Sequence, residues 1–409
     1  MEGNENMAIG QQIPSSSVQV SDHPLILPDL PFQVITEILA RLPVKSLMRF
    51  KCVSKSWLSL TLSPHFIKRH LSFSTSKDRE HLLFIDYNSG RFKHCSLASL
   101  LYEQPSDAVE IVCPQLECRD QSVLLVGCCN GLICICTTRE GFVLWNPSTR
   151  KSKTLPDFSF EKTSEHKFYA SCGFGYDETN DDYKVVAVTC YCAEDWEPFA
   201  SEVKVYSTKT DTWRRIGDFP DGYPMSGSGN RYCGTFAEGK VHWVLNRAFC
   251  PYVVFLDLAT ETYGSLDLPG DAIKSNRDSF VTDIQTVGGS LYFFCRNYEH
   301  GLVDLWVLKE YGVIESWTKV VSALSYDKRY FLSVLYQLEN GKLLVVLESD
   351  VRVLNPKNNK SRRLLRSVYT RSASIYVESL VSPGSVDATT MMSGLQLRTL
   401  KASTSRTQD

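Results

Sequence analysis

Hydrophobic residues follow two different periods along the chain, and the change falls near residue 80. Between residues 27 and 70 apolar positions recur at the 3.6-residue spacing of an α-helix. From residue 81 onward the apolar runs are short, β-branched or aromatic, and separated by turn residues. The pattern predicts a small all-α unit followed by an all-β domain, so the chain is expected to be a multidomain α+β protein.

The first of these stretches, residues 27–70, predicts three short helices. Asp29 can cap the first helix, and Pro43 ends that helix and begins the second. The apolar residues that follow this helical period are Ile35, Ile38, Leu39, Leu42, Leu47, Phe50, Val53 and Trp57. A unit of this size closes only a small core. We therefore expect its surplus apolar face to bind a partner, the alternative being a cap packed on the rest of the chain.

A repeat runs through the all-β region. Tight turns that lead into an apolar strand occur at Asn130-Gly131, Glu238-Gly239, Gly288-Gly289 and Asn340-Gly341. Each is followed by a strand that ends in a polar hairpin, such as the Asn-Pro-Ser-Thr turn at residues 146–149. Matching positions in those strands, Leu144, Val205, Phe255, Leu305 and Val353, are 61, 50, 50 and 48 residues apart. A period near 50 predicts a β-propeller, here of about six blades.

The two ends of the repeat region predict how the ring closes. Residues 81–112 fit a degenerate first blade, and residues 374–381 make one further strand beyond the last full unit. Pairing of that strand with the first blade removes an exposed sheet edge. Residues 181–192 are expected to supply an inner strand of the blade that ends at Arg215.

The same patterns divide the chain into five segments. Residues 1–24 and 384–409 are polar, lack periodicity and are expected to be disordered. Between them we expect a docking unit at 25–71, a linker at 72–80 and the propeller at 81–383.

Composition excludes several classes of function. The net charge of −2 gives no argument for binding nucleic acid or a membrane surface, and no apolar run is long enough to span a bilayer. The N-terminus lacks the apolar core of a signal peptide. The 14 cysteines match no zinc-binding spacing and are expected to be core thiols in a reducing compartment, the cytoplasm or the nucleus. Seven Lys and Arg with no acidic residue between Arg41 and His70 suit an acidic partner or form a solvated face.

No catalytic motif occurs in the chain: neither a nucleophile elbow, a phosphate loop, a zinc-protease motif nor a dinucleotide fingerprint. We therefore expect no enzymatic activity, no cofactor and no metal. Longer insertions between the strands carry residue types that dominate interfaces, and they are either target contacts or simply exposed loops. These low-specificity candidates are Trp196, Tyr223, Arg231, Tyr232 and Tyr298.

The run LPVKSLMRFKCVSKSWLSL, together with the preceding Leu30-Pro31, resembles the F-box of plant proteins along its whole length. The resemblance implies docking to a Skp-family adaptor, which is tied through cullin to a RING subunit. The positions that match the motif are Leu30, Pro31, Ile35, Ile38, Leu39, Leu42, Pro43, Leu47, Phe50, Val53 and Trp57. The sequence does not divide them between contacting the adaptor and supporting the fold.

Residues 81–381 resemble the F-box-associated region of plant F-box proteins, most clearly in NGLICIC, VLWNPSTRKSKTLP and FGYDETNDDYKVV. The paired-glycine element of kelch repeats is weak, so the repeat is only kelch-like. The resemblance implies a substrate receptor of an SCF-type ubiquitin ligase whose propeller binds a protein target. A Skp-bound scaffold that delivers nothing for degradation and a propeller-fold enzyme are the alternatives.

Overall fold

A computed structural model of the chain describes residues 30–384, except 75–78, 87–88, 90, 104–107, 117–122, 138–140, 158–166, 193–197, 221–232, 248–249, 271–278, 298–301, 326–331, 348 and 367. The N-terminal segment 1–24 and almost all of the C-terminal segment 384–409, both predicted to be disordered, lie outside the described residues.

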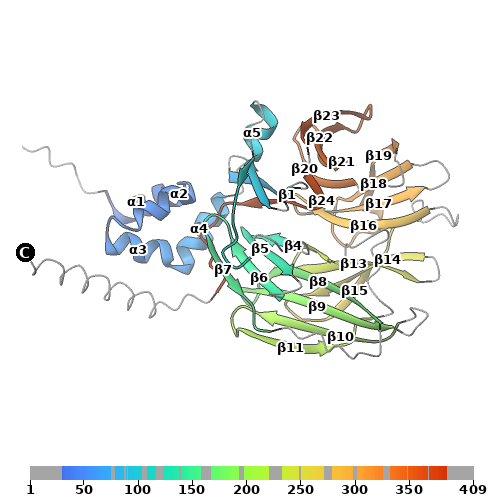
Figure 1. Cartoon of the computed structure of the whole chain (residues 1–409), viewed down its shortest axis with the longest axis horizontal. Helices are drawn as coiled ribbons and strands as arrows, with labels where there is room; N and C mark the ends of the chain where they lie inside the picture. The colour runs from blue at the N-terminus through green and yellow to red at the C-terminus, as the bar shows by residue number, and fades with distance from the viewer. Residues whose placement is uncertain are drawn as a thin grey trace, which may run out of the picture.

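Four helices form the N-terminal unit, where the sequence predicted three (Figure 1). They are α1 (Phe32–Ala40), α2 (Val44–Phe50), α3 (Lys55–Leu62) and α4 (Pro64–Phe73). The additional helix arises because Ser63 and Pro64 start a new one: the Ser63 hydroxyl accepts a hydrogen bond from the Phe66 amide (3.3 Å), and Pro64 takes the first helical position. The N-cap of α1 is Pro31 rather than Asp29, and it makes no side-chain cap.

Six four-stranded antiparallel sheets, the blades, follow the helices and are arranged as a ring (Figure 1). Blade 1 contains β24 (Val368–Val377), β1 (Glu80–Asp86), β2 (Phe92–Ser96) and β3 (Val109–Glu110). Blade 2 contains β4 (Leu124–Cys129), β5 (Leu132–Thr137), β6 (Gly141–Asn146) and β7 (Lys151–Thr154). Blade 3 contains β8 (Lys167–Asp177), β9 (Asp182–Cys192), β10 (Pro198–Ser207) and β11 (Thr212–Gly217). Blade 4 contains β12 (Thr235–Ala237), β13 (Lys240–Arg247), β14 (Cys250–Asp257) and β15 (Tyr263–Leu266); blade 5 contains β16 (Ser279–Val287), β17 (Ser290–Asn297), β18 (Leu302–Leu308) and β19 (Trp317–Ser325); blade 6 contains β20 (Leu332–Gln337), β21 (Leu343–Leu347), β22 (Asp350–Asn355) and β23 (Lys360–Leu365). A short helix, α5 (Leu97–Tyr102), follows β2, and a 3-10 turn, η2 (Ile314–Ser316), precedes β19.

The ring closes as the sequence predicted. Strand β24, near the C-terminus, pairs antiparallel with β1, with Leu82 opposite Ile375 and Leu83 opposite Ser374. Blade 1 is therefore built from both ends of the propeller, and β24 covers the edge of β1 that would otherwise be unpaired. The closing strand runs from Val368 to Val377 and not over the predicted residues 374–381, because the chain leaves the sheet after Val377 and Leu380 packs into the helical unit.

The repeat register predicted from the sequence is confirmed. Its five aligned residues fall on the third strand of blades 2 to 6, namely Leu144 on β6, Val205 on β10, Phe255 on β14, Leu305 on β18 and Val353 on β22. At the first predicted turn, Asn130 and Gly131 both have positive φ (52° and 79°), as a tight type I′ hairpin requires. The predicted inner strand at residues 181–192 is also present: it is β9, which lies between β10 and the innermost strand β8 of blade 3.

Hydrophobic side chains of neighbouring blades make up the core. Trp145 of blade 2, for example, is buried and its ring lies 5.5 Å from that of Phe92 in blade 1. Among the residues described, no helix has the length and apolar character needed to cross a membrane.

Candidate functional site

A set of apolar side chains remains exposed on the helical unit. Of the ten large hydrophobic residues exposed in the described chain, five lie between residues 30 and 53. This set, called the docking surface below, consists of Leu30, Phe32, Val34, Ile38 and Val53. Val34 and Ile38 are one turn apart and share a face of α1, and Ile38 is 48% exposed. A surface of this kind in a water-facing module marks a binding site for another protein.

The structure divides the motif positions that the sequence left together. Leu39 and Leu47 are buried and form the core of the helical unit with Val44 and Phe66. Ile35, Leu42, Phe50 and Trp57 are partly buried against that core. Leu30, Pro31, Ile38, Pro43 and Val53 are exposed. Only this last group is free to contact a partner without unpacking the helices, and Phe32 and Val34 join it although the sequence analysis did not select them.

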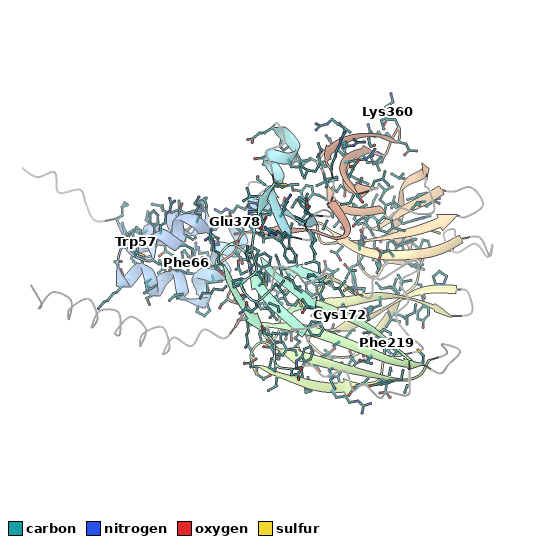
Figure 2. The ribbon with its side chains drawn as sticks, viewed as in Figure 1. Trp57, Phe66, Cys172, Phe219, Lys360 and Glu378 are labelled. Atoms are coloured by element: carbon teal, nitrogen blue, oxygen red, sulfur yellow. The ribbon has the colours of Figure 1, made fainter. Side chains whose placement is uncertain are left out.

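Residues 378–381, which follow the closing strand, join the helical unit to the propeller. Leu380 is buried in the same cluster as Leu39 and Phe66. One Glu378 carboxylate oxygen accepts a hydrogen bond from the Val44 amide (3.4 Å), and the other lies 3.4 Å from Nε2 of His81. The hydrogen bond with His81 lowers the pKa of Glu378, so this carboxylate is charged at neutral pH. Figure 2 shows Glu378 between the helices and the blades.

Two further contacts lie near this junction, one within the helical unit and one between that unit and blade 3. The His70 ring is fully buried, and its Nε2 lies 3.0 Å from the Leu42 carbonyl. Burial lowers the pKa of His70, so the imidazole is neutral at pH 7 and donates its Nε2 proton to that carbonyl. Farther out, Lys68 forms an exposed ion pair with Asp181 of blade 3 (2.9 Å). The helical unit is thus packed on the propeller rather than tethered by a linker alone.

The helical unit occupies one face of the ring. Its partner Asp181 lies in the turn between β8 and β9, at the start of β9, whereas Cys192 is the last residue of that strand. The eleven residues of β9 span about 36 Å at the usual rise of a strand. The end of β9 and the start of β10 therefore lie at the opposite face, as Figure 1 shows.

The five predicted target contacts, Trp196, Tyr223, Arg231, Tyr232 and Tyr298, lie outside the described residues. The described strand ends on either side of Trp196, at Cys192 and Pro198, belong to the face away from the helices. The structure leaves these five positions as predictions.

The innermost strands of the six blades surround a central cavity of about 390 Å³. Polar side chains in its wall have partners within the protein: Oε1 of Gln285 accepts a hydrogen bond from the Val334 amide (3.0 Å), and Nε2 of Gln285 donates one to Asp283 (2.9 Å). Across the described residues, no three His, Cys, Asp or Glu side chains are placed to hold a metal ion. The docking surface is the candidate site that the exposed side chains of the described residues support best.

Comparison with known proteins agrees with this geometry. A family model described as the F-box domain matches residues 27–69, and one described as the F-box associated beta propeller domain matches residues 91–383. An F-box/kelch-repeat protein of Arabidopsis thaliana is 30% identical over 365 residues, covering 87% of this chain and 96% of that protein. The F-box protein CPR1 of the same plant is 30% identical over 378 residues, covering 86% and 88%.

Among solved structures, TolB from Acinetobacter baumannii has a TM-score of 0.32 and 11% identity, over 75% of this chain and 58% of that one. A likeness at this level carries no argument about function. The two family models together cover both domains in their observed order. The chain therefore belongs to the plant F-box proteins that carry an F-box-associated β-propeller.

Proposed function

We propose that this chain is the substrate-recognition subunit of an SCF-type (Skp–cullin–F-box) E3 ubiquitin ligase. The docking surface binds a Skp-family adaptor, which connects the chain through cullin to a RING subunit. The propeller binds a protein target that remains to be identified, and the chain itself performs no chemistry. The proposed setting is the cytoplasm or the nucleus, where these partners occur.

One observation carries the proposal: Leu30, Ile38 and Val53 stay exposed although the helices beneath them are packed on the propeller. If the helical unit were a structural cap, the apolar side chains of the docking surface would face the blades. Instead Leu380 fills the buried side, and the outer side is left to water. Burying an apolar side chain of this size under a partner removes it from water, which is favourable by about 1.5–3 kcal/mol of free energy for each side chain.

The packed junction supports the proposed role in a second way. A receptor brings a target close to the ubiquitin-transfer machinery, and a short, stiff connection raises the effective concentration of one near the other. Contacts of Glu378, Leu380 and Lys68 fix the helices on one face of the ring. The opposite face is left for a target.

The test is a binding and transfer assay with the full chain, a purified plant Skp adaptor and the cullin–RING complex. We expect the wild type to bind the adaptor and the double variant Ile38→Asp/Val53→Asp to lose at least 100-fold in affinity, about 2.7 kcal/mol. Val313→Asp, which places the same charge at an exposed apolar position near blade 5, is the matched control and should bind normally. Normal binding by the double variant would refute the docking assignment.

The alternative of a Skp-bound scaffold differs only in the fate of the bound protein. Proteins captured by the wild type should acquire ubiquitin in the reconstituted reaction, and their cellular levels should rise when the double variant replaces the wild type. Adaptor binding without either effect would favour the scaffold.

A further inference from the structure

Two cysteines from neighbouring blades meet at the wall of the central cavity. The sulfur of Cys172, on β8 of blade 3, lies 3.3 Å from that of Cys233, just before β12 of blade 4. Their backbones form an isolated parallel bridge, and the Gly234 amide donates a hydrogen bond of 2.7 Å to the Cys172 carbonyl. Figure 2 shows Cys172 among the inner strands of the ring.

The packing around the pair holds these strands close together. A Cβ on Gly173 would lie 2.4 Å from Val241, and one on Gly234 would lie 2.5 Å from both Val241 and Trp243. Only residues without side chains allow this approach, and each glycine is next to one of the two cysteines. Paired strands lie about 4.7–4.9 Å apart, within the range of Cα separations that a disulfide spans.

We propose that Cys172 and Cys233 form a reversible disulfide that joins blade 3 to blade 4 under oxidising conditions. No other assignment in this chain uses either thiol. The bond would connect two blades that are otherwise held by packing, hydrogen bonds and the ion pairs of Glu261 with Lys184 and Arg214, and it would lie in the wall of the cavity.

The order of the reaction follows from exposure. Cys233 is half-buried and lines the cavity, so a small oxidant that enters the cavity reaches it. Cys172, in contrast, is only 5% exposed. The contact with Cys233 and burial both raise the pKa of Cys172, which keeps this thiol protonated at neutral pH. Cys233 is therefore the sulfur that is oxidised first, and Cys172 resolves the intermediate.

With hydrogen peroxide as the oxidant, the atoms and electrons balance. The Cys233 thiolate attacks one peroxide oxygen, the O–O bond breaks, and the products are a sulfenic acid and hydroxide, which takes up the thiol's proton to become water. The Cys172 sulfur then attacks the Cys233 sulfur and displaces the sulfenic oxygen, which leaves as a second water with the Cys172 proton. Two thiols lose two electrons and one peroxide gains them. A dithiol reductant of the thioredoxin class reverses the step.

The test uses the full chain carrying Cys52→Ser, because Cys52 is exposed and would link molecules to one another. The protein is reduced, treated with hydrogen peroxide and digested without reductant, and its peptides are analysed by mass spectrometry. We expect a linked pair that joins Cys172 to Cys233. Because the bond closes a segment of 61 residues, the melting temperature of the oxidised form should exceed that of the reduced form by about 5 °C, and dithiothreitol should abolish the difference.

Each variant is compared with itself, oxidised against reduced, so any loss of stability from the substitution cancels. Cys172→Ala and Cys233→Ala should lose the temperature difference, and Cys295→Ala, which removes a buried thiol from blade 5, should retain it. A difference that survives in Cys233→Ala, equal melting temperatures in the parent, or a linked pair made by other cysteines would overturn the proposal. Cys136 is the relevant competitor, since it belongs to the same core cluster.

Discussion

The side chain of Asn146, the last residue of β6, donates a hydrogen bond of 2.7 Å to the backbone carbonyl of Val381. The same amide group also lies 3.1 Å from the Ser379 carbonyl, and its oxygen accepts a hydrogen bond from the Ser148 amide (2.9 Å). Asn146 is fully buried. One residue thus shapes a hairpin turn in blade 2 and holds the segment that carries Leu380 into the helical unit.

Replacing Asn146 by Ala should therefore lower the free energy of unfolding by far more than the loss of its hydrogen bonds within the turn. Two buried carbonyls would lose their donor, and each such loss costs about 1–3 kcal/mol. We expect the free energy of unfolding in urea to fall by about 2–4 kcal/mol. Asn355 is the matched control: it opens the equivalent Asn-Pro turn in blade 6, and its side-chain oxygen accepts a hydrogen bond from the Lys357 amide (3.1 Å). Asn355→Ala should cost about 1 kcal/mol or less, and equal losses at both sites would refute the anchoring role.

Leu380 should contribute more to the stability of the junction than the ion pair at the edge of the junction does. Removing its buried side chain leaves a cavity between the helices and the propeller, which costs about 2–5 kcal/mol. The pair between Lys68 and Asp181 is about half exposed on both sides, and such pairs contribute about 0–1 kcal/mol. We expect Leu380→Ala to speed hydrogen exchange at the amides of α1 and α2 markedly, and Lys68→Ala to leave it nearly unchanged. Indistinguishable exchange in the two variants would contradict this ranking.

Much of the fold was predictable because its signals are local. The turn at Asn130-Gly131 depends on two neighbouring residues. Each repeat unit marked by the series from Leu144 to Val353 is likewise a short stretch of the chain that predicts a hairpin of fixed register. The sequence analysis assigned no strand to β8, where Gly173 and Gly175 weaken the strand pattern. In the structure they are needed for close packing, since a Cβ on Gly175 would lie 2.2 Å from Phe236.

The candidate site was only half predictable, for a different reason. Ile38 and Leu39 are adjacent and both fit the apolar stripe of α1, yet one is exposed and the other buried. Leu39 packs in a cluster with Leu47 and Phe66, which come from other helices, and with Leu380, which comes from the far end of the chain. A helical period shows that a face is apolar but not which part of it the propeller covers.

This division gives a prediction about the docking surface. Leu39→Asp buries a charge in the core of the helical unit, so we expect α1 and α2 to unfold, with loss of helical circular dichroism as well as adaptor binding. Ile38→Asp places the charge at the surface and should leave the circular dichroism spectrum and melting temperature within error of the wild type. Its affinity for the adaptor should fall at least tenfold, about 1.4 kcal/mol, in a calorimetric titration. An unfolded Ile38→Asp, or a folded Leu39→Asp that still binds, would show that the two residues have been assigned to the wrong sides.

His242 should make the propeller sensitive to mild acid. Its ring is fully buried on β13, with Nε2 2.8 Å from the Tyr311 hydroxyl and Nδ1 3.3 Å from the Thr235 carbonyl. Burial lowers the pKa of His242 to about 4, from an ordinary value of 6.5. Between those two values the unfolded chain binds a proton that the folded chain does not. The contribution of this neutral imidazole to stability is therefore complete above pH 6.5 and is lost as the pH falls toward 4, in total about 3 kcal/mol.

The measurement is the free energy of unfolding in urea at pH 7, 6, 5 and 4.5, for the wild type and for His242→Gln. Burial also lowers the pKa of His70 and His94, so the wild type loses stability from all three rings in the upper part of this range. The difference between the two curves isolates His242: the variant should be less stable at pH 7, because Gln fits the Tyr311 and Thr235 partners less well, and the gap should narrow as the pH falls. His65→Gln, which removes an exposed ring from α4, is the control for replacing a histidine away from this site. A gap between wild type and His242→Gln that stays constant from pH 7 to 4.5 would mean that this imidazole takes up its proton equally well in the folded and unfolded chain.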